Sequence, residues 1–358
     1  MPTILHVVET LGRGGAEIMF INYINSLPPV FKNIVVYLQE PATLEKELNN
    51  VLYVKCLGLR KKNGIPLISL RLYRIIKKHK VNLIHSHLFW PTVVSRLANI
   101  EQLPHIFSVH TIMTDDAFKP NRLSKYLEKL TYSTHQHALF VSNAAFSDYN
   151  AHINLSGKAS VLYNFIREEY YKAVAQKANF GGDKFKLVSV GNLRPQKGYL
   201  FLIKCLKALD GYNISLDIYG EGSQRGELET YIEVNGVKNV RLMGSHPQPW
   251  MILKEYDAFV LATQYEGFCL AMAEAMAVGL PCIVPAIDAL VEISGNKQLY
   301  FDLNDHQDCI EKIMELYQQE MQVKHYSKLA YQHATRFSKA VHIEQLVGFY
   351  EAELKAAK

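Results

Sequence analysis

The stretch Gln264–Pro281, QYEGFCLAMAEAMAVGLP, predicts a loop that runs into a buried helix and carries two glutamates, Glu266 and Glu274. Alanine, leucine and methionine fill its middle and favour a helix, and Gly279 and Pro281 signal its end. Glu266 would then lie at the helix mouth and Glu274 about two turns inside. A helix that is apolar on most sides is buried, so Glu274 needs hydrogen-bond donors or a bound ligand.

Two interpretations of these glutamates stay open at this point. The N–H groups and positive dipole end at a helix N-terminus suit a phosphate, and the two carboxylates suit hydroxyls of the same ligand. Alternatively, Glu274 forms a salt bridge with a core arginine and Glu266 is a surface residue.

Length and composition predict a two-domain globular protein. The chain has 358 residues, of which 49% are hydrophobic and 20% charged, and a chain of this length usually divides into two domains. No apolar run reaches the roughly 18 residues of a membrane span, and no signal peptide is evident, so we expect a cytoplasmic protein. The five cysteines are scattered singly, which argues against disulfides and a zinc ribbon.

Basic residues are concentrated in the first half of the chain. Residues 1–166 carry 18 Lys and Arg against 10 Asp and Glu, a net +8, and the remainder carries 21 against 24, a net −3. A basic amphipathic helix is expected within Leu59–Lys80, and its apolar face would consist of Leu67, Ile68, Leu72, Ile75 and Ile76. Arg71 to Lys80 could contact an anionic membrane, or the helix could pack on the core with a basic solvated side. Nucleic acid is not an expected partner.

Strands and helices alternate along both halves of the chain. Repeated strand and helix units with short links predict parallel sheets covered on both faces. The alternation is interrupted at Arg167–Asp183, which we interpret as the connection between a domain at 1–166 and a second at 167–336. The fold class is therefore α/β, with two Rossmann-like βαβ domains and a cleft between them.

Candidate ligand-facing groups follow several strands of the first domain. The strand Ile4–Glu9 runs into the glycine-rich turn Thr10–Glu17, whose spacing does not fit the dinucleotide fingerprint and which is either a cleft-facing loop or a plain tight turn. His85 and His87 share one face of a strand, and His110 ends the next. An H-x-H pair can bind zinc, but no third ligand with suitable spacing follows, so we expect cleft or core histidines and no metal site.

In the second domain the turn VGNLRPQKG, Val190–Gly198, follows a strand and precedes a helix. Its two cations, Arg194 and Lys197, beside a helix N-terminus suit a diphosphate. The Walker pattern is absent, so the turn is not a P-loop. For Arg194 alone, a basic surface turn is the alternative.

Together these motifs resemble glycosyltransferase family 4, the large family of retaining glycosyltransferases with the two-domain GT-B fold. The resemblance rests on Gly191–Gly198, Ile218–Ser223, Val240–Gly244, the glutamates 266 and 274 with seven residues between them, and, in the first half, Gly12–Glu17, His85–His87, His110 and Val141–Asn143. It implies that the C-terminal helix, at about 337–358, packs back on the N-terminal domain.

The resemblance also implies roles for single residues. Lys197 would neutralise the diphosphate, Glu274 would hold the ribose, and Glu266 would bind hydroxyls of the donor sugar. His110 would face that sugar near the reacting carbon. Further donor contacts would come from Gly14, Gly15, Gly267, Phe268, Cys269 and Leu270. The family usually has arginine in place of Asn192, and Arg194, two residues on, is the candidate replacement.

We therefore expect a retaining, metal-independent hexosyltransferase without a cofactor, which uses a nucleotide-diphosphate sugar, UDP-linked rather than GDP-linked. Its acceptor would be a sugar or a lipid-linked saccharide in bacterial envelope polysaccharide, lipopolysaccharide or capsule synthesis. The uneven charge favours a peripheral position on the inner face of the membrane. The missing arginine at Asn192 supports an alternative, a non-catalytic nucleotide-sugar-binding partner of another glycosyltransferase.

Overall fold

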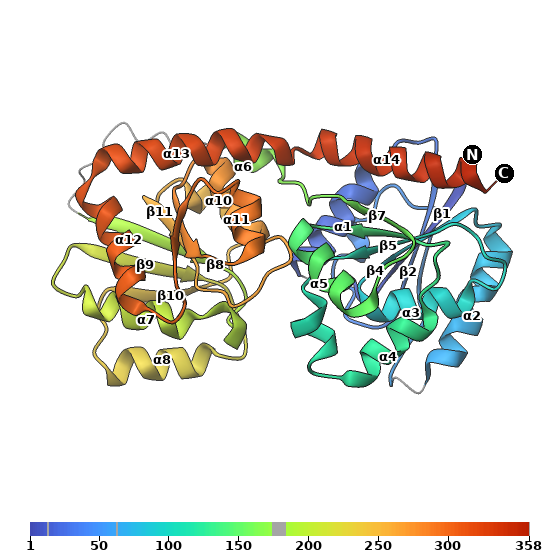
Figure 1. Ribbon diagram of the computed structural model, residues 1–358, viewed down its shortest axis with the longest axis horizontal. Coiled ribbons are helices and arrows are strands. Elements are labelled where there is room, and N and C mark those ends of the chain that lie inside the picture. The colour runs from blue at the N-terminus through green and yellow to red at the C-terminus, as the bar shows by residue number, and fades with distance from the viewer. Residues whose placement is uncertain (13, 62–63, 174–183, 358) are drawn as a thin grey trace. The chain divides into compact units, whose positions relative to one another are not determined.

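The computed structural model describes residues 1–12, 14–61, 64–173 and 184–357, which form two α/β units (Figure 1). Unit 1 consists of Met1–Phe165 and Lys339–Lys358, and unit 2 consists of Ile166–Ser338. The chain therefore passes from unit 1 into unit 2 and returns to unit 1 with its last helix. This division lies within three residues of the expected boundaries at 166 and 336.

Unit 1 contains a seven-stranded parallel sheet in the order β3-β2-β1-β4-β5-β6-β7. Its strands are β1 (Thr3–Val8), β2 (Lys32–Tyr37), β3 (Tyr53–Cys56), β4 (Leu83–His87), β5 (His105–Val109), β6 (His137–Phe140) and β7 (Lys158–Val161). The strand order reverses between β1 and β4, so loops that follow these two strands diverge and leave a crevice at their carboxyl ends, where α/β proteins bind ligands.

Helices cover both faces of this sheet, with α1 and α14 on one face and α2, α3 and α4 on the other (Figure 1). The helices of unit 1 are α1 (Gly15–Ser26), α2 (Ile65–His79), α3 (Phe89–Ala98), α4 (Arg122–Thr131), α5 (Asn143–Ile153) and α14 (Lys339–Ala356), with a 3-10 turn η1 (Glu45–Glu47) and a π turn η3 (Thr114–Phe118). The sequence pattern did not predict β3, which is a half-exposed edge strand and so lacks a continuous apolar run.

The basic helix α2 packs on the sheet through Ile65, Ile68, Leu72, Ile75 and Ile76. The assignment of Leu67 to this buried face was wrong, because Leu67 is 54% exposed. At 3.6 residues per turn Leu67 falls on the stripe of Arg71, Arg74 and Lys78, not on that of Ile68 and Leu72. The outer side of α2 is therefore basic with an exposed leucine edge.

Unit 2 contains a six-stranded parallel sheet in the order β10-β9-β8-β11-β12-β13. Its strands are β8 (Phe185–Val190), β9 (Ile214–Tyr219), β10 (Val240–Gly244), β11 (Ala258–Val260), β12 (Cys282–Pro285) and β13 (Leu299–Phe301). Its helices are α6 (Glu168–Lys172), α7 (Tyr199–Ala208), α8 (Arg225–Val234), α9 (Pro249–Leu253), α10 (Leu270–Val278), α11 (Asp288–Ser294), α12 (His306–Gln318) and α13 (Glu320–Ala334), with 3-10 turns η4 (Pro195–Lys197) and η5 (Thr335–Phe337).

Two expectations about this unit need correction. Helix α10 begins at Leu270, so Glu274 lies just over one turn from its start and not two. Residues 167–173, expected to connect the domains, belong to unit 2, where α6 packs against α10. The rest of that stretch, residues 174–183, lies outside the described residues.

No helix in the described part of the chain combines the length and the apolar character of a membrane span. All five cysteines are free thiols, four of them buried and Cys56 half-buried.

Candidate functional site

The turn after β8 brings Lys197 against the loop that carries Glu266. Gly198 has a left-handed φ of 66°, and a Cβ at this position would overlap the carbonyl oxygen of Ala262, so only glycine allows this close approach. Two hydrogen bonds tie the segments together, from the Gln264 amide (2.8 Å) and the Thr263 hydroxyl (3.2 Å) to the Gln196 carbonyl. The position of Lys197 is therefore set by backbone contacts.

Lys197 forms an ion pair with Glu266 in a half-buried setting, where the two side chains are 23% and 14% exposed. Burial lowers the pKa of Lys197, but the Glu266 carboxylate outweighs burial and leaves this pKa above its ordinary value. Glu266 is thus not the surface residue of the alternative interpretation. The pair places a cation and a carboxylate side by side in front of α10.

Glu274 lies half-buried on α10 beside Tyr170 and Arg167, which come from the segment around α6. Burial raises the pKa of Glu274 to about 7, although the Tyr170 hydroxyl hydrogen-bonds the carboxylate and the Arg167 charge lies close enough to lower that pKa. Arg167 also lies over the ring of Trp250, 4.6 Å from its centre. Sequence reasoning missed Tyr170 and Arg167, because they fall in the stretch interpreted as a connection.

The start of α10 is built from the buried residues Gly267, Phe268 and Cys269. Cys269 has a left-handed φ of 59°, which is uncommon outside glycine and is concentrated at functional sites. Burial raises the pKa of the Cys269 thiol. Cys269 is the N-cap residue of α10, although its side chain makes no capping hydrogen bond, and the Phe268 ring packs edge-on against Phe337 with ring centres 5.2 Å apart.

Asn192 and Arg194 are both exposed on the turn after β8. The charge of Arg194 is close enough to lower the pKa of Lys197, an effect smaller than those of burial and Glu266. Two cations thus share this turn, as expected, while the replacement of the family arginine by Arg194 stays a prediction.

Gly14, Gly15 and His110 belong to unit 1, and the other predicted site residues belong to unit 2. Gly14 is the N-cap of α1 in extended conformation, and Gly15 is the first residue of that helix. The Glu17 carboxylate lies against Gly14 and accepts a hydrogen bond from the Thr10 hydroxyl at 3.1 Å. Residue 13 lies outside the described residues.

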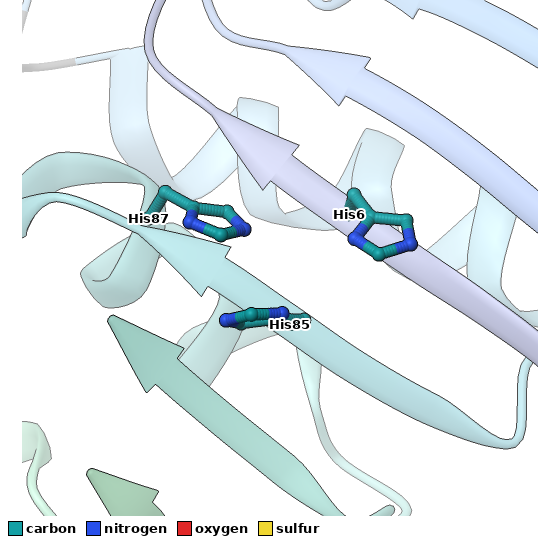
Figure 2. A group of neighbouring side chains, drawn as sticks. All are labelled: His6, His85 and His87. Atoms are coloured by element: carbon teal, nitrogen blue, oxygen red, sulfur yellow. The ribbon is translucent and has the colours of Figure 1, made fainter. Parts of the chain in front are cut away.

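A third histidine joins the H-x-H pair, contrary to the expectation that no third ligand accompanies it. His6 on β1 is the register partner of His85 on β4, and the three rings of His6, His85 and His87 gather over the same face of the sheet (Figure 2). Their ligand nitrogens lie within 4.8 Å of one another. Sequence reasoning looked for the third residue downstream, whereas parallel pairing supplies it from the first strand.

The three rings form a hydrogen-bonded network in which each ring nitrogen faces a protein group. Nε2 of His6 contacts Asn33 Oδ1 (3.3 Å), and its Nδ1 contacts the Tyr23 hydroxyl (3.4 Å). Nδ1 of His85 contacts the Tyr350 hydroxyl (2.6 Å), and its Nε2 contacts Ser108 Oγ (2.8 Å). Nε2 of His87 contacts the Tyr23 hydroxyl (2.5 Å), and its Nδ1 contacts His110 Nε2 (3.2 Å). Burial lowers the pKa of His6 to about 3 and those of His85 and His87 well below 6.5. A metal ion here would have to replace these hydrogen bonds, so the geometry favours a network of neutral imidazoles.

Two pockets of unit 1 meet at His110, which contributes to the lining of both. The first is lined by the β1–α1 turn, His87 and Asn164. The second has a volume of about 300 Å³ and is lined by Trp90 and Glu128, among others. One oxygen of Glu128 binds Arg96 at 2.9 Å, and the other has no hydrogen-bond partner among the described residues.

Two family models match the chain, one to each half. The model described as Glycosyltransferase Family 4 matches residues 13–170, and the model described as Glycosyl transferases group 1 matches residues 172–334. The chain belongs to glycosyltransferase family 4 and has its two-domain GT-B fold, which confirms the predicted fold class.

Individual relatives show how far this likeness extends. The chain is 28% identical over 242 residues to the Escherichia coli UDP-Gal:alpha-D-GlcNAc-diphosphoundecaprenol alpha-1,3-galactosyltransferase, a match that spans 62% of each chain, less than two thirds of that enzyme. It is 24% identical over 82% of each chain to the Campylobacter jejuni N-acetylgalactosamine-N,N'-diacetylbacillosaminyl-diphospho-undecaprenol 4-alpha-N-acetylgalactosaminyltransferase. The crystal structure of Anabaena HepE in complex with UDP matches 98% of this chain and 100% of its own with a TM-score of 0.81 at 18% identity.

Proposed function

We propose that this protein is a retaining hexosyltransferase that uses a UDP-sugar as donor and a sugar or lipid-linked saccharide as acceptor. The observation that carries the proposal is the Lys197–Glu266 pair, held by backbone contacts in front of α10 with Glu274 one turn further on. Cation, helix N-terminus and two carboxylates together match the parts of a nucleotide-diphosphate sugar. The UDP complex of HepE and the UDP-galactose donor of the Escherichia coli enzyme support UDP over GDP.

Binding of the donor would break the ion pair between Lys197 and Glu266 and give each side chain a new partner. Lys197 would turn from Glu266 to the diphosphate, with Arg194 as second cation, and the released Glu266 would accept hydrogen bonds from sugar hydroxyls. Ribose hydroxyls would donate to Glu274 and favour its charged form, against the burial that raises its pKa to about 7. The cations would thus meet the anionic diphosphate, and the two carboxylates would accept hydrogen bonds from neutral hydroxyls.

Catalysis would come mainly from stabilising the leaving diphosphate. Cleavage of the bond between the anomeric carbon and phosphate puts positive charge on the sugar ring and negative charge on the diphosphate. Lys197, Arg194 and the N–H groups at the start of α10 would stabilise that anion without a metal ion or cofactor. The acceptor oxygen would attack the same face while the leaving phosphate takes its proton, so that configuration is retained and no dedicated base is needed.

The second pocket of unit 1 is our candidate for the acceptor. Half-buried Trp90 contributes an aromatic ring to the wall of this pocket, beside which a sugar ring would pack, and the inner wall includes Glu128, whose carboxylate is buried against Arg96. The names of the Escherichia coli and Campylobacter jejuni relatives specify acceptors on diphosphoundecaprenol. A lipid-linked saccharide in bacterial envelope synthesis is therefore the acceptor class that we propose.

Thermal unfolding with UDP, GDP and their sugars tests the donor assignment. UDP and one or more UDP-sugars are expected to stabilise the protein, by about 2.7 kcal/mol at 100 times the dissociation constant. Stabilisation by GDP alone would overturn the donor assignment, and no stabilisation by any nucleotide would overturn the proposal. Release of UDP on adding a lipid-linked acceptor would support the enzyme, whereas binding without release under any acceptor would support the non-catalytic partner suggested by Asn192.

Flotation with liposomes tests a peripheral membrane position. The exposed side of α2 combines Leu67 and Leu70 with Arg74 and Lys78, and we expect it to bind anionic vesicles. Each basic residue near an anionic surface contributes about 1 kcal/mol, so the R74Q/K78Q variant should bind roughly 30-fold more weakly.

The matched control is K204Q/K207Q, which removes two exposed lysines from α7 in unit 2. It should float like the wild type. Equal flotation of both variants and the wild type would dismiss α2 as a membrane contact.

A further inference from the structure

A chain of three hydrogen-bonded side chains leads from the core of unit 1 to its two pockets. The Tyr23 hydroxyl on α1 lies 2.5 Å from His87 Nε2, and His87 Nδ1 lies 3.2 Å from His110 Nε2. His110 then borders both pockets, and no described residue hydrogen-bonds its other nitrogen, Nδ1. Nδ1 of His110 is therefore the nitrogen that would contact a ligand in either pocket, as a hydrogen-bond donor if it carries the proton and as an acceptor if it does not.

The inner end of this chain has a fixed hydrogen-bond direction. The Asn33 amide nitrogen donates to the Asn50 carbonyl at 3.1 Å, so the Asn33 oxygen is the atom that faces His6 Nε2. A carboxamide oxygen only accepts, so His6 carries its proton on Nε2. A neutral His6 then turns a lone pair on Nδ1 toward the Tyr23 hydroxyl, 3.4 Å away.

Tyr23 has one proton and two possible acceptors. The contact with His87 is 2.5 Å and that with His6 is 3.4 Å. A separation of 2.5 Å is typical of an O–H donor and is shorter than the roughly 2.7–3.2 Å of an N–H donor. Tyr23 therefore donates to His87 Nε2. His87, when neutral, then carries its proton on Nδ1 and donates to His110 Nε2, which leaves the proton of His110 on Nδ1.

We propose that Tyr23 and His87 are positioning residues that hold His110 as the Nδ1–H tautomer, so that His110 donates a hydrogen bond to an oxygen of the bound substrate. The opposite direction, with Tyr23 donating to His6, would give His110 a lone pair on Nδ1 and make it an acceptor for the proton of the attacking hydroxyl. The direction of the hydrogen bonds in this network thus determines whether Nδ1 of His110 acts as a hydrogen-bond donor or as a base. Only the identity of the substrate oxygen rests on the proposed function.

The network can hold a tautomer because its imidazoles stay neutral. An imidazolium has protons on both nitrogens and no tautomer to choose. Burial lowers the pKa of His110 to about 4, with a further contribution from His342, and lowers the pKa of His87 well below 6.5. At neutral pH each ring therefore carries one proton, whose place is set by its neighbour.

Ring nitrogen chemical shifts report the tautomer directly. In ¹⁵N-histidine-labelled protein without substrate at pH 7.5, we expect His110 as a single Nδ1–H tautomer, with its signals assigned by their loss in H110Q. Y23F removes the proton that biases His87, so the His110 signals should move toward a mixture of both tautomers.

Y350F is the matched control. It removes another buried tyrosine hydroxyl from the same cluster, the one that contacts His85 at 2.6 Å outside the chain of three, and it should leave His110 unchanged. An Nε2–H tautomer in the wild type would overturn the proposal, as would an unchanged His110 in Y23F or the same change in both variants.

Kinetics then test the consequence for transfer. Y23F should lower kcat about 2- to 10-fold with the donor KM unchanged, which corresponds to weakening one neutral hydrogen bond, and Y350F should change neither constant. Equal losses in both variants would indicate a structural role and overturn the positioning role. If no sugar nucleotide and acceptor react with the wild type, the proposed function fails, while the tautomer measured in the free protein still stands or falls by itself.

Discussion

Replacing Lys197 by alanine is expected to lower kcat about 100- to 1,000-fold while the protein stays folded, because a preorganised donor to a developing anion contributes about 3–4 kcal/mol. Lys197 is the cation that backbone contacts place at the start of α10, next to Glu266. Its loss leaves Glu266 without its ion-pair partner, but that carboxylate keeps 14% of its side chain exposed and can be solvated. The expected decrease is therefore mainly in transfer and not in stability.

Single-turnover transfer with saturating UDP-sugar measures this effect. K204A, which removes an exposed lysine from the neighbouring helix α7, is the control and should behave like the wild type. E274A should instead raise the donor KM, because Glu274 is proposed to bind the ribose. Near-normal turnover of K197A, with a thermal midpoint equal to that of the wild type, would refute the assignment of Lys197.

Unit 1 is expected to lose stability steeply as the pH falls below 6.5. Burial lowers the folded-state pKa of seven of its histidines, His137 among them, and does so strongly for six: His6 and His105 to about 3, His110 and His342 to about 4, and His85 and His87 well below the ordinary value. In the unfolded chain these rings take up protons near pH 6.5, whereas the folded unit keeps them neutral. Their contribution to stability is thus complete above pH 6.5 and lost as the pH falls toward the folded-state values.

The magnitude follows from linkage. Each neutral histidine costs about 1.4 kcal/mol of stability per pH unit below 6.5, so six can remove up to about 8 kcal/mol by pH 5.5, which is comparable to the whole stability of a domain. In the described part of unit 2, only His333 has a lowered histidine pKa, at about 4. Unit 2 should therefore be less acid-sensitive.

The two tryptophans separate the units in this experiment. Trp90 belongs to unit 1 and Trp250 to unit 2, so urea titrations of W250F and W90F followed by fluorescence report on one unit each. Between pH 7.5 and 5.5 the midpoint of unit 1 should fall well before that of unit 2. Parallel midpoints for both units, or no change in unit 1 over this range, would contradict the expectation.

The order of elements in unit 2 could be predicted from local pattern. The apolar runs Phe185–Val190 and Ile214–Tyr219 are bounded by turn residues, and both are observed as the strands β8 and β9 with those bounds. Parallel strands with helical crossovers follow from such alternation. The edge strand β3 was missed, because its half-exposed residues show no comparable run.

The residues of the candidate site could be predicted from sequence motifs, but the residues that they contact in space could not. Lys197 and Glu266 are 69 positions apart, and they meet because β8 and β11 are adjacent in the sheet. His6 reaches His85 because β1 pairs with β4. Strand order depends on which surfaces bury best against each other, and no local pattern records it.

In the stretch Gln264–Pro281, too, local structure could be predicted from the sequence whereas tertiary contacts could not. Its sequence by itself determined a buried helix with a carboxylate at the mouth and another inside, since both follow from residue preferences over a few turns. Only the tertiary structure decided the partners: Lys197 for Glu266, and Tyr170 with Arg167 for Glu274. The reason is physical: helix propensity acts between neighbours in the chain, whereas the pairing of buried charges depends on which segments folding brings together.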